Sequence, residues 1–275
     1  MTLKILAVLA EAATAKGCLD GALAAARIQP GARIEAFHVK VDPNRLAGAP
    51  EEIAIQRLRE LEEGTADQRA SAVRAIFDRW LGAQSALDVE HIHWREEIGA
   101  EAEKVLEEAR LADLLVMARP HDMDAHDAMH AILFSTALPL LVPADWSPLT
   151  NESLGGHIVI AWKSTPQAKR AVECAAPWLR KASRVTILAI ARTAEEARLK
   201  EAQDLLDGLG IAGEQLFLLT EKIDLAEQIL QIAHQLRANV LVMGAYRHNK
   251  LIEWALGGTT RHILSKADMP VFLAH

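Results

Sequence analysis

Residues 238–243 read ANVLVM, and residues 112–117 read ADLLVM. Each stretch has an alanine, then Asp or Asn, then four apolar residues. A second pair follows later in the chain, because LPLLV at 138–142 resembles MPVFL at 269–273. Repeats this far apart are copies of a whole domain and not the short units of a solenoid. The sequence therefore predicts that one domain occurs twice.

Apolar runs alternate with helical patterns in both copies. In the first half we expect strands at Lys4–Ala10, Arg33–Val41, Val89–Trp94, Asp113–Ala118 and Leu138–Val142. Helices are expected at Leu19–Arg27, at Glu51–Leu81 as one helix or a pair, and at Ala100–Arg110.

The second half repeats this plan. Its expected strands are His157–Trp162, Arg184–Ala191, Gln215–Thr220, Val240–Met243 and Val271–Ala274. Its expected helices are Pro166–Lys181, Ala194–Leu209 with Thr193 as the N-cap, Leu225–Leu236, and a last one that begins near Thr259.

Strands separated by helices indicate βαβ units and parallel sheets covered by helices on both faces. The fold class is therefore α/β, with two tandem doubly wound, Rossmann-like domains at 1–145 and 157–275. Residues 146–156 are rich in Pro, Gly, Ser and Asn, which is typical of a linker. In such sheets ligands bind beyond the carboxyl ends of the strands, where the strand order reverses.

Composition excludes several classes of protein. A formal net charge of −7 argues against a general nucleic-acid binder, whose affinity comes from Lys and Arg. The apolar run Ile5–Ala10 is too short for a signal peptide, and no run reaches the ~18 residues of a membrane span. The two cysteines, Cys18 and Cys174, predict reduced, buried side chains. We expect a cytoplasmic protein without membrane partners.

The segment after Val240–Met243 resembles a phosphate cradle. Gly244 lets the backbone approach a ligand closely, and Gly257-Gly258 lead into a helical pattern. The first N–H groups of a helix lack intrahelical partners and carry partial positive charge, so an anion binds there readily. Thr259 or Thr260 is a candidate to cap this helix or to contact the anion.

These residues resemble the universal stress protein family, whose nucleotide-binding members carry G-x2-G-x9-G-S/T at this place. Gly244 and Gly257 are in register, and GGTTRHIL and the closing ADMPVFLAH also resemble the family. The resemblance implies a tandem protein with stress-linked binding or signalling roles and ATP or another adenine nucleotide as ligand. It also implies a pseudo-dimer, in which the terminal strands Leu138–Val142 and Val271–Ala274 of the two domains pair.

Two positions depart from the family pattern. Arg247 stands where the family has its second glycine, and Lys163 stands where it usually has Asp or Asn. Either these cations hold phosphate, as their chemistry permits, or they end nucleotide binding. The candidate site consists of Ala161, Trp162, Lys163, Ser164, Met243, Gly244, Arg247, Gly257, Gly258, Thr259 and Thr260.

The first half has no glycine between Gly99 and Gly155, so we expect no backbone cradle there. It carries HDMDAHDAMH at 121–130, in which Asp122, His126 and His130 would share one face of a helix. That spacing resembles zinc-hydrolase motifs, but no third ligand run accompanies it. We expect a polar loop and helix start without a metal.

Three functions remain as hypotheses. The first is a stress-response binding module that senses an adenine nucleotide in its second half. The second is a structural or partner-binding protein of the same fold without nucleotide. An enzyme is the third, but the chain shows neither a nucleophile–base pair in context nor a G-x4-G-K-S/T motif. We expect no enzymatic activity beyond slow ATP hydrolysis; a homodimer remains open.

Overall fold

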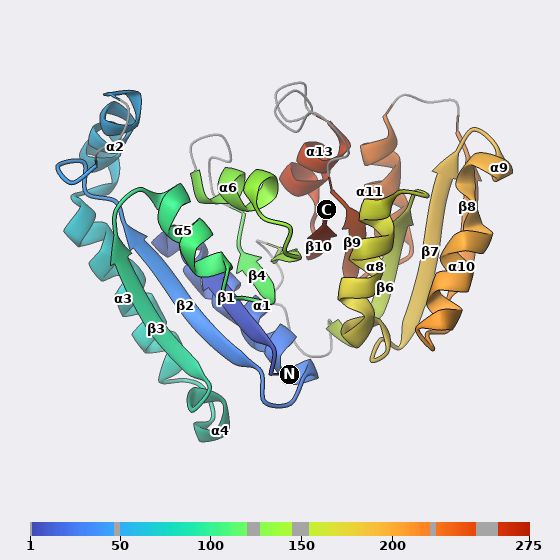
Figure 1. The fold of residues 1–275 in the computed structure, drawn as a ribbon, viewed down its shortest axis with the longest axis horizontal. Helices are drawn as coiled ribbons and strands as arrows, with labels where there is room; N and C mark the ends of the chain where they lie inside the picture. The colour runs from blue at the N-terminus through green and yellow to red at the C-terminus, as the bar shows by residue number, and fades with distance from the viewer. Residues whose placement is uncertain (1, 47–49, 120–126, 145–153, 221–223, 246–257) are drawn as a thin grey trace.

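The computed structural model describes residues 2–46, 50–119, 127–144, 154–220, 224–245 and 258–275. Within these residues the strands form one ten-stranded sheet, to which each half of the chain contributes five strands (Figure 1). The first half lies on one side of a central seam and the second half on the other.

The first half contains the helices α1 (Ala12–Ile28), α2 (Pro50–Glu63), α3 (Ala66–Leu81), α4 (Ala86–Val89), α5 (Glu101–Ala109) and α6 (Asp127–Ser135). Its strands are β1 (Lys4–Val8), β2 (Arg33–Lys40), β3 (Ile92–Ile98), β4 (Leu114–Met117) and β5 (Leu140–Val142). The break between α2 and α3 lies at Gly64, which has a φ of 89°, followed by a capping box from Thr65 to Gln68.

The second half contains the strands β6 (His157–Trp162), β7 (Arg184–Ala191), β8 (Glu214–Leu219), β9 (Val240–Gly244) and β10 (Val271–Ala274). Its helices are α8 (Pro166–Leu179), α9 (Ala194–Ala197), α10 (Leu199–Gly208), α11 (Leu225–Gln235) and α13 (Thr259–Lys266). Among the described helices, none combines the length and the apolar character needed to cross a bilayer.

The strand order is β3-β2-β1-β4-β5-β10-β9-β6-β7-β8, and the two halves meet where β5 pairs with β10. This pair is antiparallel, with Leu141 opposite Phe272, whereas every other neighbouring pair is parallel. The pairing expected between the two terminal strands is confirmed. It joins two parallel sheets into one and covers an edge of each.

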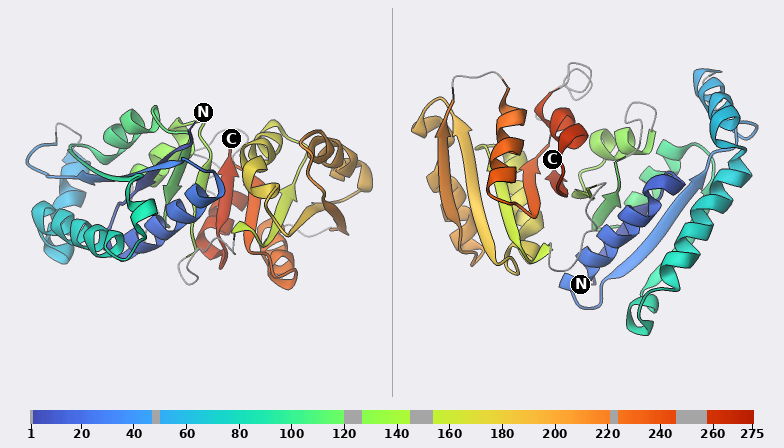
Figure 2. Two further views of the ribbon diagram at one scale, coloured as in Figure 1. Left: turned by 90° about the horizontal axis from the view of Figure 1, so that it is seen from below. Right: turned by 180° about the vertical axis from the view of Figure 1, so that it is seen from behind.

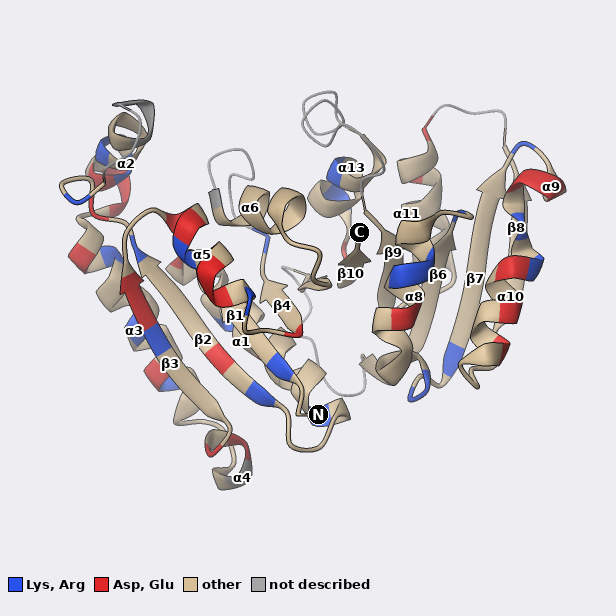
Figure 3. Cartoon of the chain, in the orientation of Figure 1, with Lys and Arg blue, Asp and Glu red and all other residues tan. Residues whose placement is uncertain are grey.

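Helices cover both faces of the sheet, as views from below and behind show (Figure 2). Each face has a core that runs through both halves. On one face α1, α3, α8 and α10 contribute, with Leu141 and Phe272 at the seam. On the other face α5, α6, α11 and α13 contribute, with Leu140 and Leu273 at the seam. The halves are therefore packed as a single body. Charged residues are numerous on α3, α5 and α10 (Figure 3), whereas the central strands β4, β5, β9 and β10 contain none.

A polar contact repeats in the two halves, at the matching positions of ADLLVM and ANVLVM. The carboxylate of Asp113 accepts a hydrogen bond from the backbone N–H of Lys4, at 2.9 Å. The amide oxygen of Asn239 accepts the same bond from the N–H of His157, at 2.8 Å. Lys4 and His157 are thus equivalent first residues of β1 and β6.

Some expected boundaries were wrong. Helix α1 begins at Ala12 and not at Leu19, because packing on the sheet outweighs the weak helix propensity of Thr14 and Gly17. Strand β3 is shifted from Val89–Trp94 to Ile92–Ile98, because an edge strand accepts charged residues that an apolar run does not reveal.

The helix expected over Ala194–Leu209 is divided at Arg198, whose φ of 44° is left-handed. Its predicted cap is confirmed, because the side chain of Thr193 accepts a hydrogen bond from the N–H of Glu196. Most of the expected linker, residues 146–153, lies outside the described part of the chain.

Candidate functional site

The strand order of the second half reverses between β6 and β9. Helix α8, which follows β6, packs on one face of the sheet, and α13, which follows β9, packs on the other. The carboxyl ends of the two strands lie side by side, since Ala161 is paired with Met243. The structure thus brings the described candidate residues at the ends of β6 and β9 to one topological switch point, where ligands of such sheets bind.

The strand residues of the candidate site divide between the two faces. Trp162 is buried in the core under α8, and its Nε1–H finds no acceptor among the described residues. Met243 is buried in the opposite core, against which the half-buried Ala161 packs. The indole of Trp162 therefore serves packing first, and its unsatisfied donor is the polar feature it leaves at the end of β6.

Gly244 ends β9 and is a position of close approach. A Cβ atom there would lie 2.6 Å from the backbone nitrogen of Ala168 and 2.7 Å from the carbonyl carbon of Gln167. Both atoms belong to the first turn of α8. The close approach that the sequence predicts is present, but among the described residues α8 makes it. Packing alone requires a glycine here.

The loop after β6 is held by a carboxylate from α10. The Ser164 hydroxyl donates a 2.6 Å hydrogen bond to Glu201 Oε2, Arg198 donates to Oε1 at 2.8 Å, and Lys169 Nζ lies 3.4 Å away. Hydrogen bonds from Ser164 and Arg198 lower the pKa of Glu201 to about 2, so the carboxylate stays ionised. Lys163, next to Ser164, is exposed to solvent.

Helix α13 starts at Thr259, with Gly258 as its N-cap. Gly258 has no side chain that could accept hydrogen bonds from the first N–H groups. The expected cap by Thr259 or Thr260 is wrong, because both residues lie inside the helix and not at its N-cap position. Thr260 is buried and Thr259 is half-buried. Arg247 and Gly257 lie outside the described residues.

In the first half, a side chain of the protein occupies the position that corresponds to the start of α13. Helix α6 stands between β4 and β5 as α13 stands between β9 and β10. The buried carboxylate of Glu101 accepts a hydrogen bond from the backbone N–H of Ala128, in the first turn of α6, at 3.2 Å. A carboxylate of the chain thus lies where an anion would bind. Ala118 follows β4 where Gly244 ends β9.

The metal candidates are only partly described. His130 lies on α6, half-buried, with its ring 5.8 Å from that of Phe134. Asp122 and His126 lie outside the described residues. Within the described part of the chain, no three His, Cys, Asp or Glu side chains converge to hold a metal ion.

Glu101 and Glu201 were absent from the candidates that the sequence provided. Glu201 is 37 residues from Ser164, and Glu101 is 27 residues from Ala128. Acidic residues are common in the first turn of any helix, so their type gives no signal. Only the packing of helices onto the sheet reveals these two contacts.

Comparison with known protein families gives a match over part of the chain. The family model described as the universal stress protein family matches residues 175–275. No curated protein matches the chain.

Solved structures match over nearly the whole chain. A universal stress protein from Archaeoglobus fulgidus DSM 4304 aligns with a TM-score of 0.71 and 14% identity, covering 98% of this chain and 95% of its own. For a putative universal stress protein from Pseudomonas aeruginosa UCBPP-PA14 the values are 0.58, 16%, 99% and 93%. For a functionally unknown protein from Pseudomonas aeruginosa PAO1 they are 0.52, 13%, 99% and 92%. At these identities the likeness concerns the fold. The family match therefore covers residues 175–275, and the fold of both halves is similar to that of solved universal stress proteins.

Proposed function

We propose that the second half binds an adenine nucleotide, ATP or a relative, at the switch point between β6 and β9, and that the protein acts as a stress-response binding and signalling module. The observation that carries the proposal is the start of α13 at Gly258, an N-cap residue that has no side chain to accept hydrogen bonds from the first N–H groups of the helix. Ile263 and Leu264 anchor α13 in the same core as Met243.

The contrast between the halves supports a single site in the second half. Glu101 is the first residue of α5 and places a carboxylate at the N-terminus of α6. The counterpart of α5 is α11, and the equivalent acidic residue in its first turn is Glu227. The Glu227 carboxylate lies 3.2 Å from His262 Nε2 on α13, so it pairs with a side chain of α13 and not with a backbone N–H group as Glu101 does on α6.

Charge supports an orientation for the nucleotide. Glu201 stays ionised beside Ser164 and would repel phosphate, whereas it accepts hydrogen bonds from hydroxyl groups. The sugar and base would therefore lie toward Ser164 and the phosphates toward α13. Lys163 and Arg247 are the cations that the sequence offers to phosphate.

Thermal denaturation with ATP, ADP and AMP tests the proposal, because a ligand that binds only the folded state raises the midpoint with its concentration. Arg247→Glu should remove the shift by placing an anion against phosphate. Lys181→Glu is the matched control, since it makes the same charge change on an exposed lysine just beyond α8, at the far end of that helix. No shift at millimolar nucleotide would sink the proposal.

A second function, a partner-binding protein without nucleotide, is supported by Gly244. Its missing Cβ is required by the first turn of α8, so this glycine does not by itself indicate a ligand. Release of an adenine nucleotide from denatured, purified protein would decide against this second function.

The remaining parts of the proposal concern setting and activity. We propose a cytoplasmic protein without nucleic-acid or membrane partners and without enzymatic turnover beyond slow ATP hydrolysis. The net charge of −7 supports the exclusion of nucleic acid. Sedimentation equilibrium would show whether the chain also forms a homodimer.

A further inference from the structure

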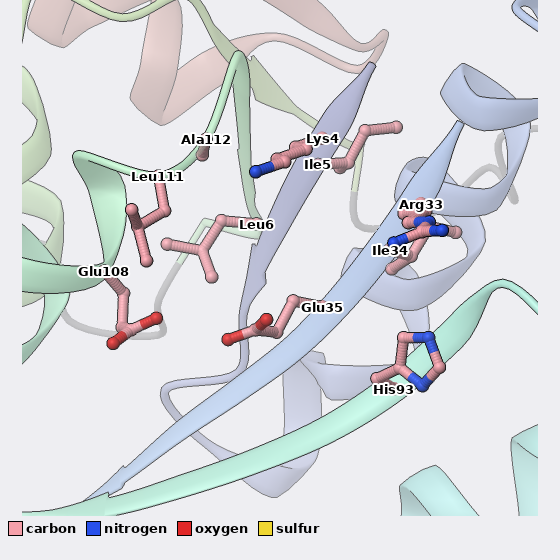
Figure 4. A pocket seen from close by; sticks show the side chains of 10 residues that line it. All are labelled: Lys4, Ile5, Leu6, Arg33, Ile34, Glu35, His93, Glu108, Leu111 and Ala112. Atoms are coloured by element: carbon pink, nitrogen blue, oxygen red, sulfur yellow. The ribbon is translucent and has the colours of Figure 1, made fainter. Parts of the chain in front are cut away.

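A cavity of about 220 Å³ opens in the first half, at the amino-terminal ends of β1 and β2 and beside the end of α5 (Figure 4). It lies at the opposite ends of the strands from the switch point. Its lining combines acidic and basic side chains with apolar ones: Lys4, Ile5, Leu6, Arg33, Ile34, Glu35, His93, Glu108, Leu111 and Ala112. The volume is below the ~300–1,000 Å³ of pockets for drug-sized ligands, so any ligand is small.

Four of these side chains share one face of the sheet. Lys4 is paired with Arg33 across β1 and β2, and Glu35 is paired with His93 across β2 and β3. Each of the four has an equivalent in the second half. The register places His157 beside Arg184, and Thr186 beside Glu214.

In the second half the four equivalents bond to each other. His157 is buried, with Nε2 2.8 Å from the Thr186 hydroxyl and Nδ1 2.9 Å from the carbonyl oxygen of Leu236, just beyond α11. Arg184 Nη2 lies 2.6 Å from a Glu214 carboxylate oxygen. The imidazole of His157 thus fills the space between the sheet and the end of α11. The charge of Arg184 is neutralised by Glu214.

In the first half the same positions remain open. Within the described part of the chain, the side chains of Lys4 and Arg33 make no hydrogen bond or ion pair. Histidine at 93 replaces the glutamate that pairs with the equivalent arginine. Glu35 replaces the threonine, and its buried Oε1 accepts no hydrogen bond from any residue that the structure describes.

The carboxylates at one end of the cavity exceed the cations. Arg95 Nη2 lies 2.8 Å from Glu108 and 3.1 Å from Glu97, and its Nε lies 3.9 Å from Glu35 Oε1. One guanidinium therefore faces three carboxyl groups. Burial, and beyond it the neighbouring Glu35, raises the pKa of Glu108. The excess negative charge at this end of the cavity favours a ligand with a cationic N–H donor.

The other end calls for an anion. Lys4 and Arg33 are the first residues of their strands and supply two positive charges there. Leu6 and Leu111 form an apolar part of the lining beside Glu35 and Glu108 (Figure 4). Arg33 and Glu35 are two residues apart on the same face of β2, about 6.6 Å between Cα atoms. That spacing suits adjacent ammonium and carboxylate groups, each hydrogen-bonded to its opposite charge.

We propose that this cavity binds a small zwitterion with an apolar body, a free amino acid such as leucine, with its ammonium group on Glu35 and its carboxylate on Arg33 and Lys4. The ligand would supply the bonds that His157 and Glu214 supply in the second half. This proposal is independent of nucleotide binding at the switch point.

Calorimetric titration and thermal denaturation of the full chain with L-leucine test the site. Leucinamide lacks the carboxylate and 4-methylpentanoate lacks the ammonium group, so each should bind at least about tenfold more weakly than leucine. Glu35→Gln and Arg33→Gln should weaken leucine binding to a similar degree. Arg184→Gln, the equivalent change in the second half, should leave it unchanged. Equal binding of all three compounds would overturn the proposal.

A second variant replaces three cavity residues by their equivalents from the second half, which should close the cavity. Lys4→His, Glu35→Thr and His93→Glu together import the bonds of His157, Thr186 and Glu214. This triple variant should lose leucine binding and should unfold at a temperature no lower than the parent protein. Retained binding in the folded variant, or the absence of any leucine binding by the parent protein, would refute the assignment.

Discussion

Arg119 in the first half donates hydrogen bonds to the carbonyl oxygen of Leu264 in the second, at 2.8 Å, and to that of Ala267 at 3.2 Å. Leu264 lies in the last turn of α13, where carbonyl groups lack helical partners and a cation is favourable. Arg119, the second residue after β4, thus caps the C-terminus of the helix whose N-terminus is the candidate anion site.

Arg119→Met should destabilise the protein by about 1–2 kcal/mol, because it leaves two carbonyl oxygens without their charged donor. Urea denaturation measures the effect. Arg180→Met is the control, since Arg180 donates to the carbonyl oxygen of Leu209 at 3.1 Å within the second half and in an exposed place. An equal effect of the two changes would contradict a special role of the contact across the seam.

Phe272→Ala should cost about 3–5 kcal/mol, the usual range for a buried phenylalanine. Phe272 is 4% exposed, faces Leu141 across the seam and lies 5.5 Å from the ring of Trp178. Because both cores cross the seam, calorimetry should show one cooperative transition for the parent protein. Two separate transitions, one for each half, would contradict a shared core.

Gly244→Ala should destabilise the protein by about 1–3 kcal/mol, because the added methyl group meets the backbone of α8. Gly208→Ala is the matched control: its Cβ would have no neighbour within 4 Å, and alanine at this helix end is neutral or stabilising by up to ~1 kcal/mol. Denaturant midpoints compare the two. A neutral Gly244→Ala would show that α8 adjusts to the methyl group.

Glu101→Gln should destabilise the protein by about 1–2 kcal/mol, because it removes the carboxylate that faces the N-terminus of α6. Glu103→Gln makes the same change in the first turn of α5, but at an exposed side chain, and should have little effect. Equal effects of the two variants on urea denaturation would mean that only the dipole of α5 matters.

Glu201→Gln tests a pH dependence. The folded pKa of Glu201 is lowered from 4.5 to about 2, so ionised Glu201 stabilises the fold fully above 4.5 and loses this effect as the pH falls toward 2. The difference in unfolding midpoint between the parent protein and the variant should be constant from pH 5 to 7 and shrink below 4.5. A difference that stays constant down to pH 2 would contradict this role of the Glu201 carboxylate.

Much of the fold could be predicted from local patterns. The alternation of apolar strands with helices requires a parallel sheet, and strands such as VLVM are buried on both faces. The repeat of ADLLVM as ANVLVM required two copies, and the terminal strands pair as expected. Edge strand β3 was misplaced, because its charged residues carry no apolar signal.

The candidate site was predicted less completely. The sequence located the switch-point residues 161–164, 243–244 and 258–260, since these follow strands in a recognisable spacing. The sequence predicted that Gly244 allows a ligand to approach the backbone. In the structure the backbone of α8 lies so close to Gly244 that a Cβ atom would not fit. Spacing cannot distinguish a backbone neighbour from a phosphate, because both require the same small residue.

The sequence by itself determined the class of fold, its duplication and the ends of the strands where ligands bind, because periodicity and repeats are local properties. Only the tertiary structure decided which charged groups meet. Glu101 accepts a hydrogen bond from α6, and Glu201 accepts one from Ser164. Glu35 faces an open cavity, whereas its equivalent in the second half, Thr186, is hydrogen-bonded to His157. Such contacts depend on how helices pack across the sheet, and residues far apart in sequence leave no local pattern that records them.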